Sequence, residues 1–306
     1  MTQISAKIIA DSYSAINGKR ITTFELVYPR FIHSELMTHR LFSRNAMSSR
    51  AVPIEKMIGQ VLDNPAKPSH WGLNQPGMQA KVELSGRNKE YVQNLWNNAA
   101  DAVADIAEEM SECQAHKQIV NRILEPFQLM KTVLTSTEFD NFFWLRKHED
   151  AQPEIKELAE RMYEQLEWNK LLTVELDSGD WHTPYYEVGY WLKESETPLE
   201  DALAISSSCC AQVSYRLLDD SIEKARKVYQ RLVESTPVHA SPFEHCASPM
   251  RFDIMTASNL FKLGGRWEKG VTHADREGNF WSGNFKSWIQ YRQLIDGNVC
   301  NKFEEK

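Results

Sequence analysis

The densest group of residues able to bind an anion lies between positions 39 and 50. This segment holds three arginines, three serines, a histidine and an asparagine. Guanidinium groups bind phosphate through paired hydrogen bonds, and hydroxyl and backbone N–H groups complete such sites. The composition therefore indicates a site for a phosphorylated ligand, although it fits an exposed basic loop equally well. The polar residues are His39, Arg40, Ser43, Arg44, Asn45, Ser48, Ser49 and Arg50.

A second segment, residues 141–155, carries an arginine after an apolar run. Asn141 and Arg146 flank four apolar residues. We expect the Arg146 stem to be buried and its guanidinium to point into a cleft, because long basic side chains bury their carbon atoms and keep their charge in water. A surface arginine at the start of the next helix is the alternative interpretation.

Two histidines and a glutamate lie close together in a third segment. His239 and His245 are six residues apart, with Glu244 between them. We expect no metal here, because the spacing matches no helical H-E-x-x-H site and no cysteine lies at zinc-finger spacing. Histidines are more often satisfied by hydrogen bonds. Upstream, the apolar character of residues 209–215 predicts a short buried strand.

Hydrophobic periodicity predicts the elements that position these segments. Alternating apolar residues predict strands at residues 7–10 and 21–28, and the Asn17-Gly18 pair between them predicts a turn. Three- and four-residue spacing predicts helices, and Asp150 is the expected N-cap of the third. The predicted helices cover residues 31–39, 89–123, 151–168 and 220–236.

Composition limits the possible functions. The chain has 306 residues, a formal charge of −7 and 42% hydrophobic residues. An acidic balance argues against binding a nucleic acid polymer, which requires clustered Lys and Arg. Five cysteines without a C-x-x-C pair indicate reduced thiols. Because no signal peptide or membrane span is evident, we expect a cytoplasmic protein that does not associate with membranes.

Taken together, the three segments resemble the flavin-dependent thymidylate synthase family. The family signature R-H-R-x-x-S-x-N-x-x-S-x-R is matched over residues 38–50 at every fixed position except the first. Residues 141–155 resemble its N-x-x-x-L-R…A-Q-x-E-I block, and residues 122–126 resemble its Arg-x-x-x-Pro segment. Residues 211–215 and 239–245 are similar to its A-R-V-S-Y and H-x-[ST]-P-F-E-H motifs.

The order of the motifs differs from the family's. The last two motifs usually precede the R-H-R motif, whereas here they follow it, so the chain resembles a circularly permuted member. The resemblance implies an α+β fold with a mixed or antiparallel sheet packed with long helices, in a single domain over residues 1–306. Irregular insertions at 72–86 and 177–198 and an extra tail at 264–306 would depart from the family.

The resemblance implies synthesis of dTMP from dUMP, with carbon from methylenetetrahydrofolate, FAD as cofactor and NADPH as reductant. A homotetramer with active sites between subunits is implied as well. Arg146 would be catalytic, because a fixed cation stabilises negative charge that develops on the uracil ring. Implied substrate-binding residues are Ser48, Ser49, Arg50, Arg122, Arg146 and Glu35. Implied cofactor-binding residues are His39, Arg40, Asn45, Asn141, His239 and Ser241.

Four positions depart from the family pattern and leave alternatives open. Thr38 replaces an Arg, Ala46 replaces an acidic residue, Glu35 stands where Gln is common, and Thr135 stands where the family has an Asn near the flavin. One alternative is therefore a related FAD- and folate-dependent hydroxymethylase of pyrimidine nucleotides. Another is a non-enzymatic homologue that binds flavin or nucleotide.

Overall fold

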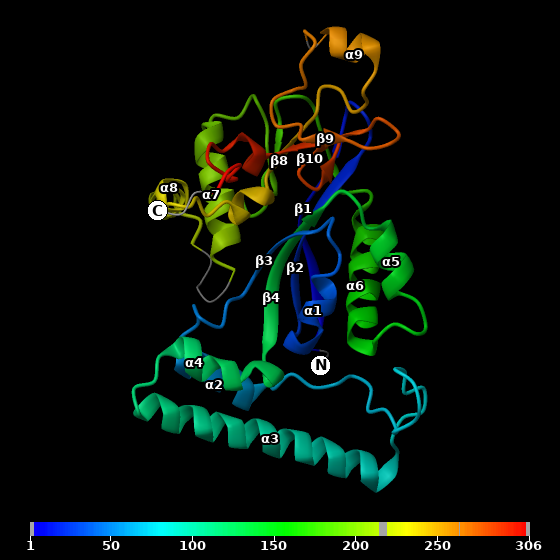
Figure 1. Cartoon of the computed structure of the whole chain (residues 1–306), viewed down its shortest axis with the longest axis vertical. Helices are drawn as coiled ribbons and strands as arrows, with labels where there is room; N and C mark the ends of the chain where they lie inside the picture. The colour runs from blue at the N-terminus through cyan, green and yellow to red at the C-terminus, as the bar shows by residue number, and fades with distance from the viewer. Residues whose placement is uncertain (1–2, 214–218, 263, 304–306) are drawn as a thin grey trace.

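A five-stranded mixed sheet forms the centre of the molecule, and the computed structural model describes residues 3–213, 219–262 and 264–303 (Figure 1). The strand order is β3-β4-β2-β1-β5, antiparallel except for the parallel pair β1 and β5. The predicted strands 7–10 and 21–28 are confirmed and are longer than predicted, and the predicted mixed sheet is confirmed. The strands are β1 (Ser5–Ser14), β2 (Arg20–Pro29), β3 (Ser43–Ala46), β4 (Leu129–Ser136) and β5 (Val174–Leu176).

One face of β2 packs against helices, because successive side chains of a strand alternate between the two faces of a sheet. Phe24, Leu26 and Tyr28 are fully buried against helix α6 (Pro153–Asn169), which follows helix α5 (Asp140–Arg146). Both helices lie on the same side of the sheet (Figure 1). The helix predicted at 151–168 is thus confirmed, and it begins directly after the segment that carries Arg146.

The N-cap of α6 was predicted wrongly. Gln152, not Asp150, caps the helix, since its Oε1 accepts a hydrogen bond from the Ile155 N–H at 3.0 Å. Pro153 follows at the first helical position, where its missing N–H is not needed. Asp150 is instead exposed and forms an ion pair with Lys81 at 3.2 Å.

The helix predicted over residues 31–39 is shorter than expected. The chain forms a 3-10 turn η1 (Arg30–Ile32) and one turn of helix α1 (His33–Leu36). The Thr38 hydroxyl donates to the Glu35 carbonyl at 2.7 Å, and Arg44 donates to the Leu36 carbonyl at 2.9 Å. These side chains take the carbonyls that further helical turns would use, so the helix ends before Thr38.

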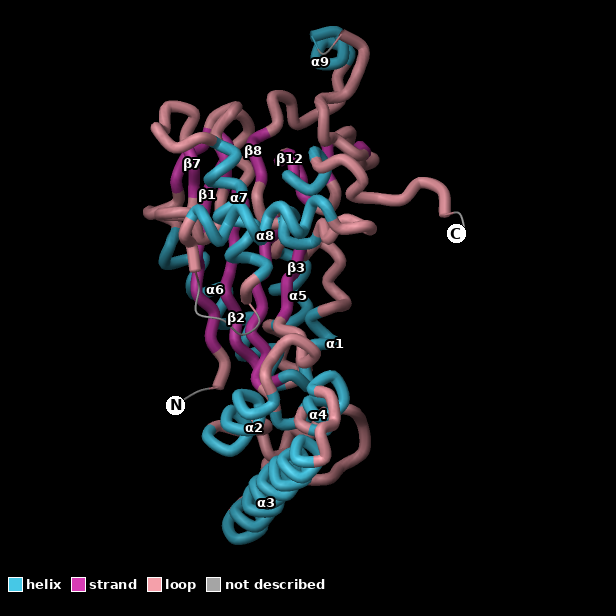
Figure 2. Tube along the Cα trace, turned by 90° about the vertical axis from the view of Figure 1, so that its left-hand side faces the viewer, coloured by secondary structure: helices cyan, strands magenta, loops and turns pink. Residues whose placement is uncertain are grey.

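A helical arm projects from one end of the sheet (Figure 2). The helix predicted at 89–123 is confirmed over residues 89–112 and wrong as a single element, since a turn in which Gln114 adopts a φ of 60° divides it into two helices. The second helix then begins at His116, whose Nδ1 accepts from the Gln118 N–H. Leu95 and Ile106, two of the apolar residues at helical spacing, are 48% and 49% exposed. The arm comprises α2 (Ile54–Asp63), α3 (Gly86–Glu112), α4 (Lys117–Ile123) and the 3-10 turn η2 (Glu125–Phe127).

Helix α7 (Leu199–Ala211) covers the other face of the sheet, where Cys210 packs on Val133. The strand predicted at 209–215 is therefore wrong for residues 209–211, which are helical; residues 214–218, with Ser214 and Tyr215 of the motif, lie outside the described residues. The sequence pattern predicts a strand here because nearly all residues of α7 are buried, so the helix lacks the usual alternation of apolar and polar residues. Helix α8 (Ile222–Glu234) confirms the helix predicted after Asp220.

A second, four-stranded sheet packs above the first. Its order is β12-β8-β6-β7, so it joins the region 177–198 to the tail. Within the region expected to be irregular, β6 and β7 are each two residues long. Phe243, in the 3-10 turn η3 (Ser241–Glu244) that precedes β8, is fully buried. The strands are β6 (Trp181–His182), β7 (Tyr190–Trp191), β8 (Ala247–Pro249) and β12 (Trp288–Gln290).

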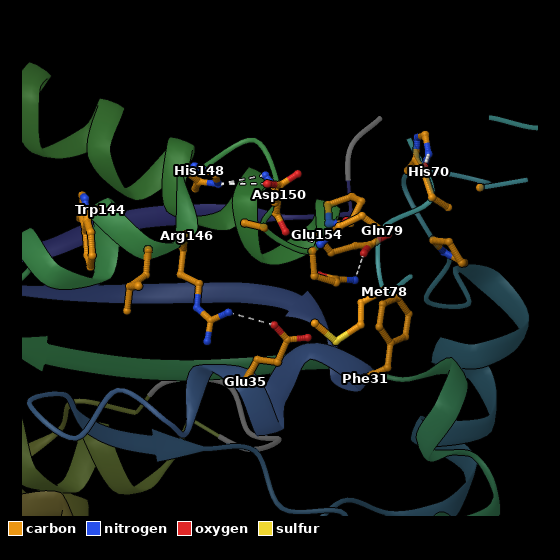
Figure 3. Close-up of a pocket in the computed structure, with 17 residues that line it drawn as sticks. Phe31, Glu35, His70, Met78, Gln79, Trp144, Arg146, His148, Asp150 and Glu154 are labelled. Atoms are coloured by element: carbon orange, nitrogen blue, oxygen red, sulfur yellow. Dashed lines mark hydrogen bonds and ion pairs between the residues drawn. The ribbon is translucent and has the colours of Figure 1, made fainter. Parts of the chain in front are cut away.

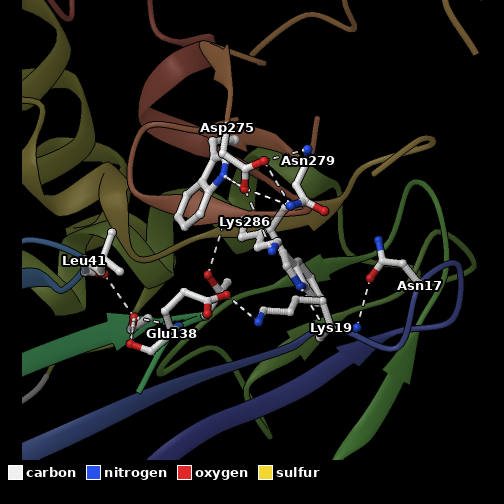
Figure 4. Close-up of polar contacts among 11 residues, drawn as sticks. Asn17, Lys19, Leu41, Glu138, Asp275, Asn279 and Lys286 are labelled. Carbon is white, nitrogen blue, oxygen red and sulfur yellow. Dashed lines mark hydrogen bonds and ion pairs between the residues drawn. The ribbon is translucent and has the colours of Figure 1, made fainter. Parts of the chain in front are cut away.

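The tail, for which the sequence predicts no secondary structure, is folded onto the central sheet. The Trp288 indole donates to the Lys19 carbonyl, and the Lys286 N–H donates to the Thr137 hydroxyl, both at 3.0 Å. Lys19 also pairs with Glu138 (Figure 4). None of the described helices is long and apolar enough to cross a membrane. The remaining elements are α9 (Ala257–Lys262), β9 (His273–Ala274), β10 (Phe280–Ser282), β11 (Phe285–Lys286) and the 3-10 turn η4 (Tyr291–Leu294).

Candidate active site

Arg146 ends helix α5 and joins three side chains of the α1 region. Its Nε donates to His39 Nε2 at 3.0 Å, its Nη1 to Glu35 Oε2 at 3.3 Å and its Nη2 to the Thr38 hydroxyl at 3.3 Å. The side chain is 21% exposed. The expectation of a buried stem and an accessible head is therefore confirmed, and the head is fixed by three partners from one short segment.

The His39 ring is held in a neutral form. It is 8% exposed and packs edge-on against Phe142, with ring centroids 4.8 Å apart. Burial, together with the nearby cations Arg146 and Arg44, lowers the pKa of His39 to about 4. Because Nε2 accepts from Arg146, Nδ1 of the neutral ring carries the proton. The ring thus has one N–H donor, at Nδ1.

Arg44 fixes the chain that carries His39, a role that sequence reasoning missed. Its Nη1 donates to the carbonyls of Leu36 at 2.9 Å and His39 at 3.1 Å. Burial lowers the pKa of Arg44, although Tyr28 and the carboxylate of Glu244 act in the opposite direction. Arg44, which the composition of the motif favours as a phosphate ligand, therefore binds backbone carbonyls instead.

A cavity of about 890 Å³ opens beside Arg146 (Figure 3). Arg146 points toward Glu35 in it, and Phe31 and Met78 line the same cavity. Residues of the α5 to α6 connection form another side, and the region predicted to be irregular at 72–86 supplies the facing wall. The cavity thus combines a charged pair with apolar side chains, as ligand pockets commonly do.

The serines and the last arginine of the motif lie in a second group, at α4. The Ser49 hydroxyl donates to Glu125 at 3.0 Å, and Arg122 and Arg30 pair with the same carboxylate at 3.0 and 2.8 Å. Arg50, next to Ser49, is exposed. Arg30 was not predicted; it directly follows Pro29 at the end of β2.

These two groups are separate within the chain. Ser48, Ser49, Arg50 and Arg122 do not line the cavity beside Arg146, which the described residues of α1, α5 and α6 surround. The structure therefore brings together Glu35, His39 and Arg146, and independently Ser49 and Arg122.

The residues expected to bind the cofactor lie on four segments: the loop after α1, β3, α5 and the start of η3. The Nδ2 of Asn45, on β3, donates to the Cys210 carbonyl at 3.3 Å, and the side-chain oxygen of Asn45 takes no part in this bond. Ser241 begins η3, which packs on β3, and His239 precedes it. Arg40, Asn141, His239 and Ser241 are exposed.

A buried polar chain lies behind η3. Its members are His182, Thr23, Thr135 and His245, joined by hydrogen bonds of 2.7–2.8 Å, and Ser12 continues it at 3.0 Å. Burial lowers the pKa of His182 and of His245 to about 3 each. Both rings are therefore neutral near pH 7. Within the described ranges, no group of three His, Cys, Asp or Glu side chains could hold a metal ion.

The three buried cysteines are poor nucleophiles. Burial raises the pKa of Cys246 to about 11 and of Cys209 to about 12, and raises that of Cys210 well above its usual value. Thiolate is the reactive form, so these thiols are inert at neutral pH. The remaining two cysteines, Cys113 and Cys300, are exposed and lie outside the groups described above.

Comparison with known proteins gives a family. The model of the thymidylate synthase complementing protein family matches residues 7–168, just over half of the chain. The chain belongs to this family. Members of the thymidylate synthase complementing protein family are typically FAD-dependent. The match includes both Arg146 and the 38–50 motif and ends within α6, before the segments at 211–215 and 239–245.

Solved structures that resemble part of the chain include a UMP/dUMP methylase, PolB from Streptomyces cacaoi. Two crystal structures of PolB, bound with 5-Br UMP and 5-Br dUMP, are each 18% identical to this chain, with TM-scores of 0.46 and 0.45. They align with 56% of this chain and with 91% and 92% of PolB. No curated protein sequence matches the chain.

Proposed function

We propose that this protein transfers the one-carbon unit of methylenetetrahydrofolate to dUMP, with FAD as cofactor and NADPH as reductant, and releases dTMP. The observation that supports this most directly is the hydrogen bond from Arg146 to His39, because it joins the two family motifs at one place although they lie 107 residues apart. Family membership supports the same reaction class.

Arg146 is the catalytic residue of this proposal. Its guanidinium stabilises negative charge on the uracil ring when the ring loses the proton at N3. Such a cation is effective when it does not have to reorganise during the reaction, and the bonds to Glu35, His39 and Thr38 hold it in place. Glu35 binds Arg146 through Oε2, so Oε1 serves as an acceptor for the substrate.

The dUMP phosphate binds at the second group. Ser48, Ser49, Arg50 and Arg122 supply hydroxyl, backbone N–H and guanidinium donors of the kind that phosphate requires. Glu125 neutralises part of this positive charge and fixes Arg122. Because this group is separate from Arg146 within one chain, we propose that a homotetramer completes each site with residues from two subunits.

The residues present fit FAD as the cofactor. The neutral His39 ring offers Nδ1–H to a flavin acceptor, and Arg40, Asn141, His239 and Ser241 are accessible to the remainder of the molecule. Asn45 contributes its carbonyl oxygen. When bound, FAD supplies the hydride that reduces the transferred carbon to a methyl group.

We also propose that the chain is a circularly permuted single domain over residues 1–306. Three contacts support this: η3 packs on β3, Asn45 bonds to Cys210, and the buried Gln290 donates both to Ser43 and to the Glu244 carbonyl. Motifs that precede the R-H-R motif in other members thus lie beside it in space, although they follow it in sequence.

The second candidate is a hydroxymethylase, which one contact favours. Thr38 stands where the family has an arginine and bonds directly to Arg146 at 3.3 Å, so the position has lost one positive charge. Transfer without reduction joins dUMP, methylenetetrahydrofolate and water to give hydroxymethyl-dUMP and tetrahydrofolate. Transfer with reduction gives dTMP and tetrahydrofolate and oxidises the flavin. The third hypothesis is a non-enzymatic protein that binds flavin or nucleotide.

Flavin absorbance under anaerobic conditions distinguishes these reactions. The FAD-loaded protein is reduced with NADPH, and methylenetetrahydrofolate and dUMP are then added singly and together. We expect the oxidised flavin spectrum to return only when both substrates are present. Consumption of dUMP without flavin oxidation would support the hydroxymethylase. Unchanged flavin and unchanged nucleotide would leave a binding protein.

A further inference from the structure

Residues 71–84, within the region expected to be irregular, form a hairpin with a fixed base. The Leu84 N–H donates to the Trp71 carbonyl at 2.8 Å, and the Leu73 N–H donates to the Val82 carbonyl at 2.7 Å. The buried Trp71 ring packs edge-on against Trp96 of α3, with centroids 6.0 Å apart. The hairpin is thus anchored on the helical arm.

The tip of the hairpin reaches the connection between α5 and α6. Gln79 donates to the Asp150 carbonyl, and Lys81 forms an ion pair with the Asp150 carboxylate at 3.2 Å. A Cβ atom at Gly72 would lie 2.2 Å from that of Ala80, so glycine is required for the two sides to approach this closely. These contacts tie the tip to the segment that follows Arg146 by four residues.

Met78, at this tip, presents an uncovered apolar side chain to the cavity. It is fully accessible (101%) yet lines the pocket that contains Arg146 and Glu35. In Figure 3 its thioether points toward Glu35, and Phe31 lines the same cavity. A methionine adapts its shape to a flat ring and interacts favourably with aromatic groups. The pocket therefore combines apolar side chains, Met78 and Phe31 among them, with the charged pair of Arg146 and Glu35.

We propose that Met78 covers one face of the pyrimidine ring of the nucleotide while Arg146 binds the edge of the ring, which makes the 71–84 hairpin a specificity wall of the active site. This inference rests on the proposed function. A pyrimidine has two apolar faces and a polar edge, and this arrangement of apolar and charged side chains complements it. The hairpin also limits how large a ring or 5-substituent the pocket accepts.

The test measures dUMP binding to the FAD-loaded protein by calorimetry, together with KM and kcat. We expect Met78→Ala to raise the Kd and KM for dUMP about tenfold and to leave kcat within about twofold, since packing on the ring is lost equally in ground and transition states. Met78→Leu keeps an apolar side chain of similar volume and should stay near wild type. Leu73→Ala and Val82→Ala change exposed apolar residues of the same hairpin that do not line the cavity, and serve as matched controls.

The outcomes separate this inference from the proposed function. Unchanged dUMP affinity in Met78→Ala, with weakened affinity in Arg146→Ala, would overturn the role of the hairpin and leave the reaction intact. An equal loss of dUMP affinity in Met78→Ala and in both control variants would also overturn the role of Met78, because the effect would then reflect a general disturbance of the hairpin. Absence of dUMP binding to the wild-type protein would contradict the proposed function itself, and the inference with it.

Discussion

Arg146 Nε donates a hydrogen bond to Nε2 of His39 over 3.0 Å, and the ring that accepts it is neutral because burial lowers its pKa to about 4. This bond fixes the orientation of the guanidinium and the tautomer of the imidazole together. Its two partners belong to motifs on α5 and on the loop after α1, so the geometry of the proposed active site depends on how these two elements pack.

Replacing Arg146 by lysine tests whether the geometry of the charge matters. Lysine keeps the positive charge but offers a single ammonium group, which cannot bond to Glu35, His39 and Thr38 in the planar arrangement of a guanidinium. We expect kcat for dTMP formation to fall by about 100-fold or more, the size of effect seen when one transition-state donor is lost.

The control is Arg161→Lys on α6, which pairs with Glu157 four residues away and lies outside the cavity. It should leave kcat unchanged. Near-normal turnover in Arg146→Lys would show that a point charge suffices or that the reacting ring lies elsewhere.

Arg50 offers a test of the phosphate site. Truncation to alanine removes one charged hydrogen-bonding partner, so we expect the Kd for dUMP to rise roughly 10- to 100-fold. Arg87→Ala removes an exposed arginine at the start of α3 and should not affect the Kd. An unchanged Kd in Arg50→Ala, measured by equilibrium dialysis, would place the phosphate at another site.

Mixing two variants that are inactive at a dUMP concentration far below the Kd of Arg50→Ala tests whether the site is shared between subunits. Arg146→Ala and Arg50→Ala are co-expressed with different tags, and the mixed oligomer is purified through both tags. If Arg146 of one subunit acts with Arg50 of another, about one quarter of the sites in a random mixture carry both arginines and activity returns. A mixed oligomer as inactive as its parents would show that both residues serve the same subunit's site.

Sequence periodicity was sufficient for elements with one clear buried face. The helix at 151–168 was found because its apolar residues recur at helical spacing, and β2 because Phe24, Leu26 and Tyr28 alternate. The break after α3 was missed because Gln114, not a glycine, adopts the left-handed conformation there. Cys209 and Cys210 were assigned to a strand because α7 is buried on nearly all sides.

The proposed site was partly accessible from sequence. Arg146, His39 and Glu35 lie in or beside matched motifs, so their types and positions pointed to them. The part played by Arg44 could not be predicted, because it depends on which carbonyls end α1. The hairpin wall could not be predicted either, since it exists only through long-range contacts such as that of Gln79 with Asp150.

The two buried histidines behind η3 predict acid sensitivity. The folded-state pKa values of His182 and His245 are about 3, whereas the ordinary value is 6.5. The unfolded chain therefore takes up protons first as the pH falls below 6.5, and the folded protein does so only near pH 3. The free energy of unfolding should decrease across this window by up to about 1.4 kcal/mol per pH unit for each histidine.

Denaturant unfolding at several pH values checks this prediction. His245→Asn removes one titrating group, so the dependence of stability on pH should be shallower by about one proton. His148→Asn, at a side chain 60% exposed, is the control and should leave the slope unchanged. The same slope in His245→Asn as in the wild type would show that His245 is protonated in the folded protein.

Identifying the nucleotide product tests the central claim most directly. The purified protein is incubated with FAD, NADPH, methylenetetrahydrofolate and dUMP, with dCMP in a parallel reaction, and the nucleotides are weighed by mass spectrometry. The account predicts that dUMP gains one CH2 unit, as dTMP, and that Arg146→Lys largely abolishes this gain. A gain of CH2O, reaction with dCMP alone, or an unaltered nucleotide in the presence of bound flavin would contradict it.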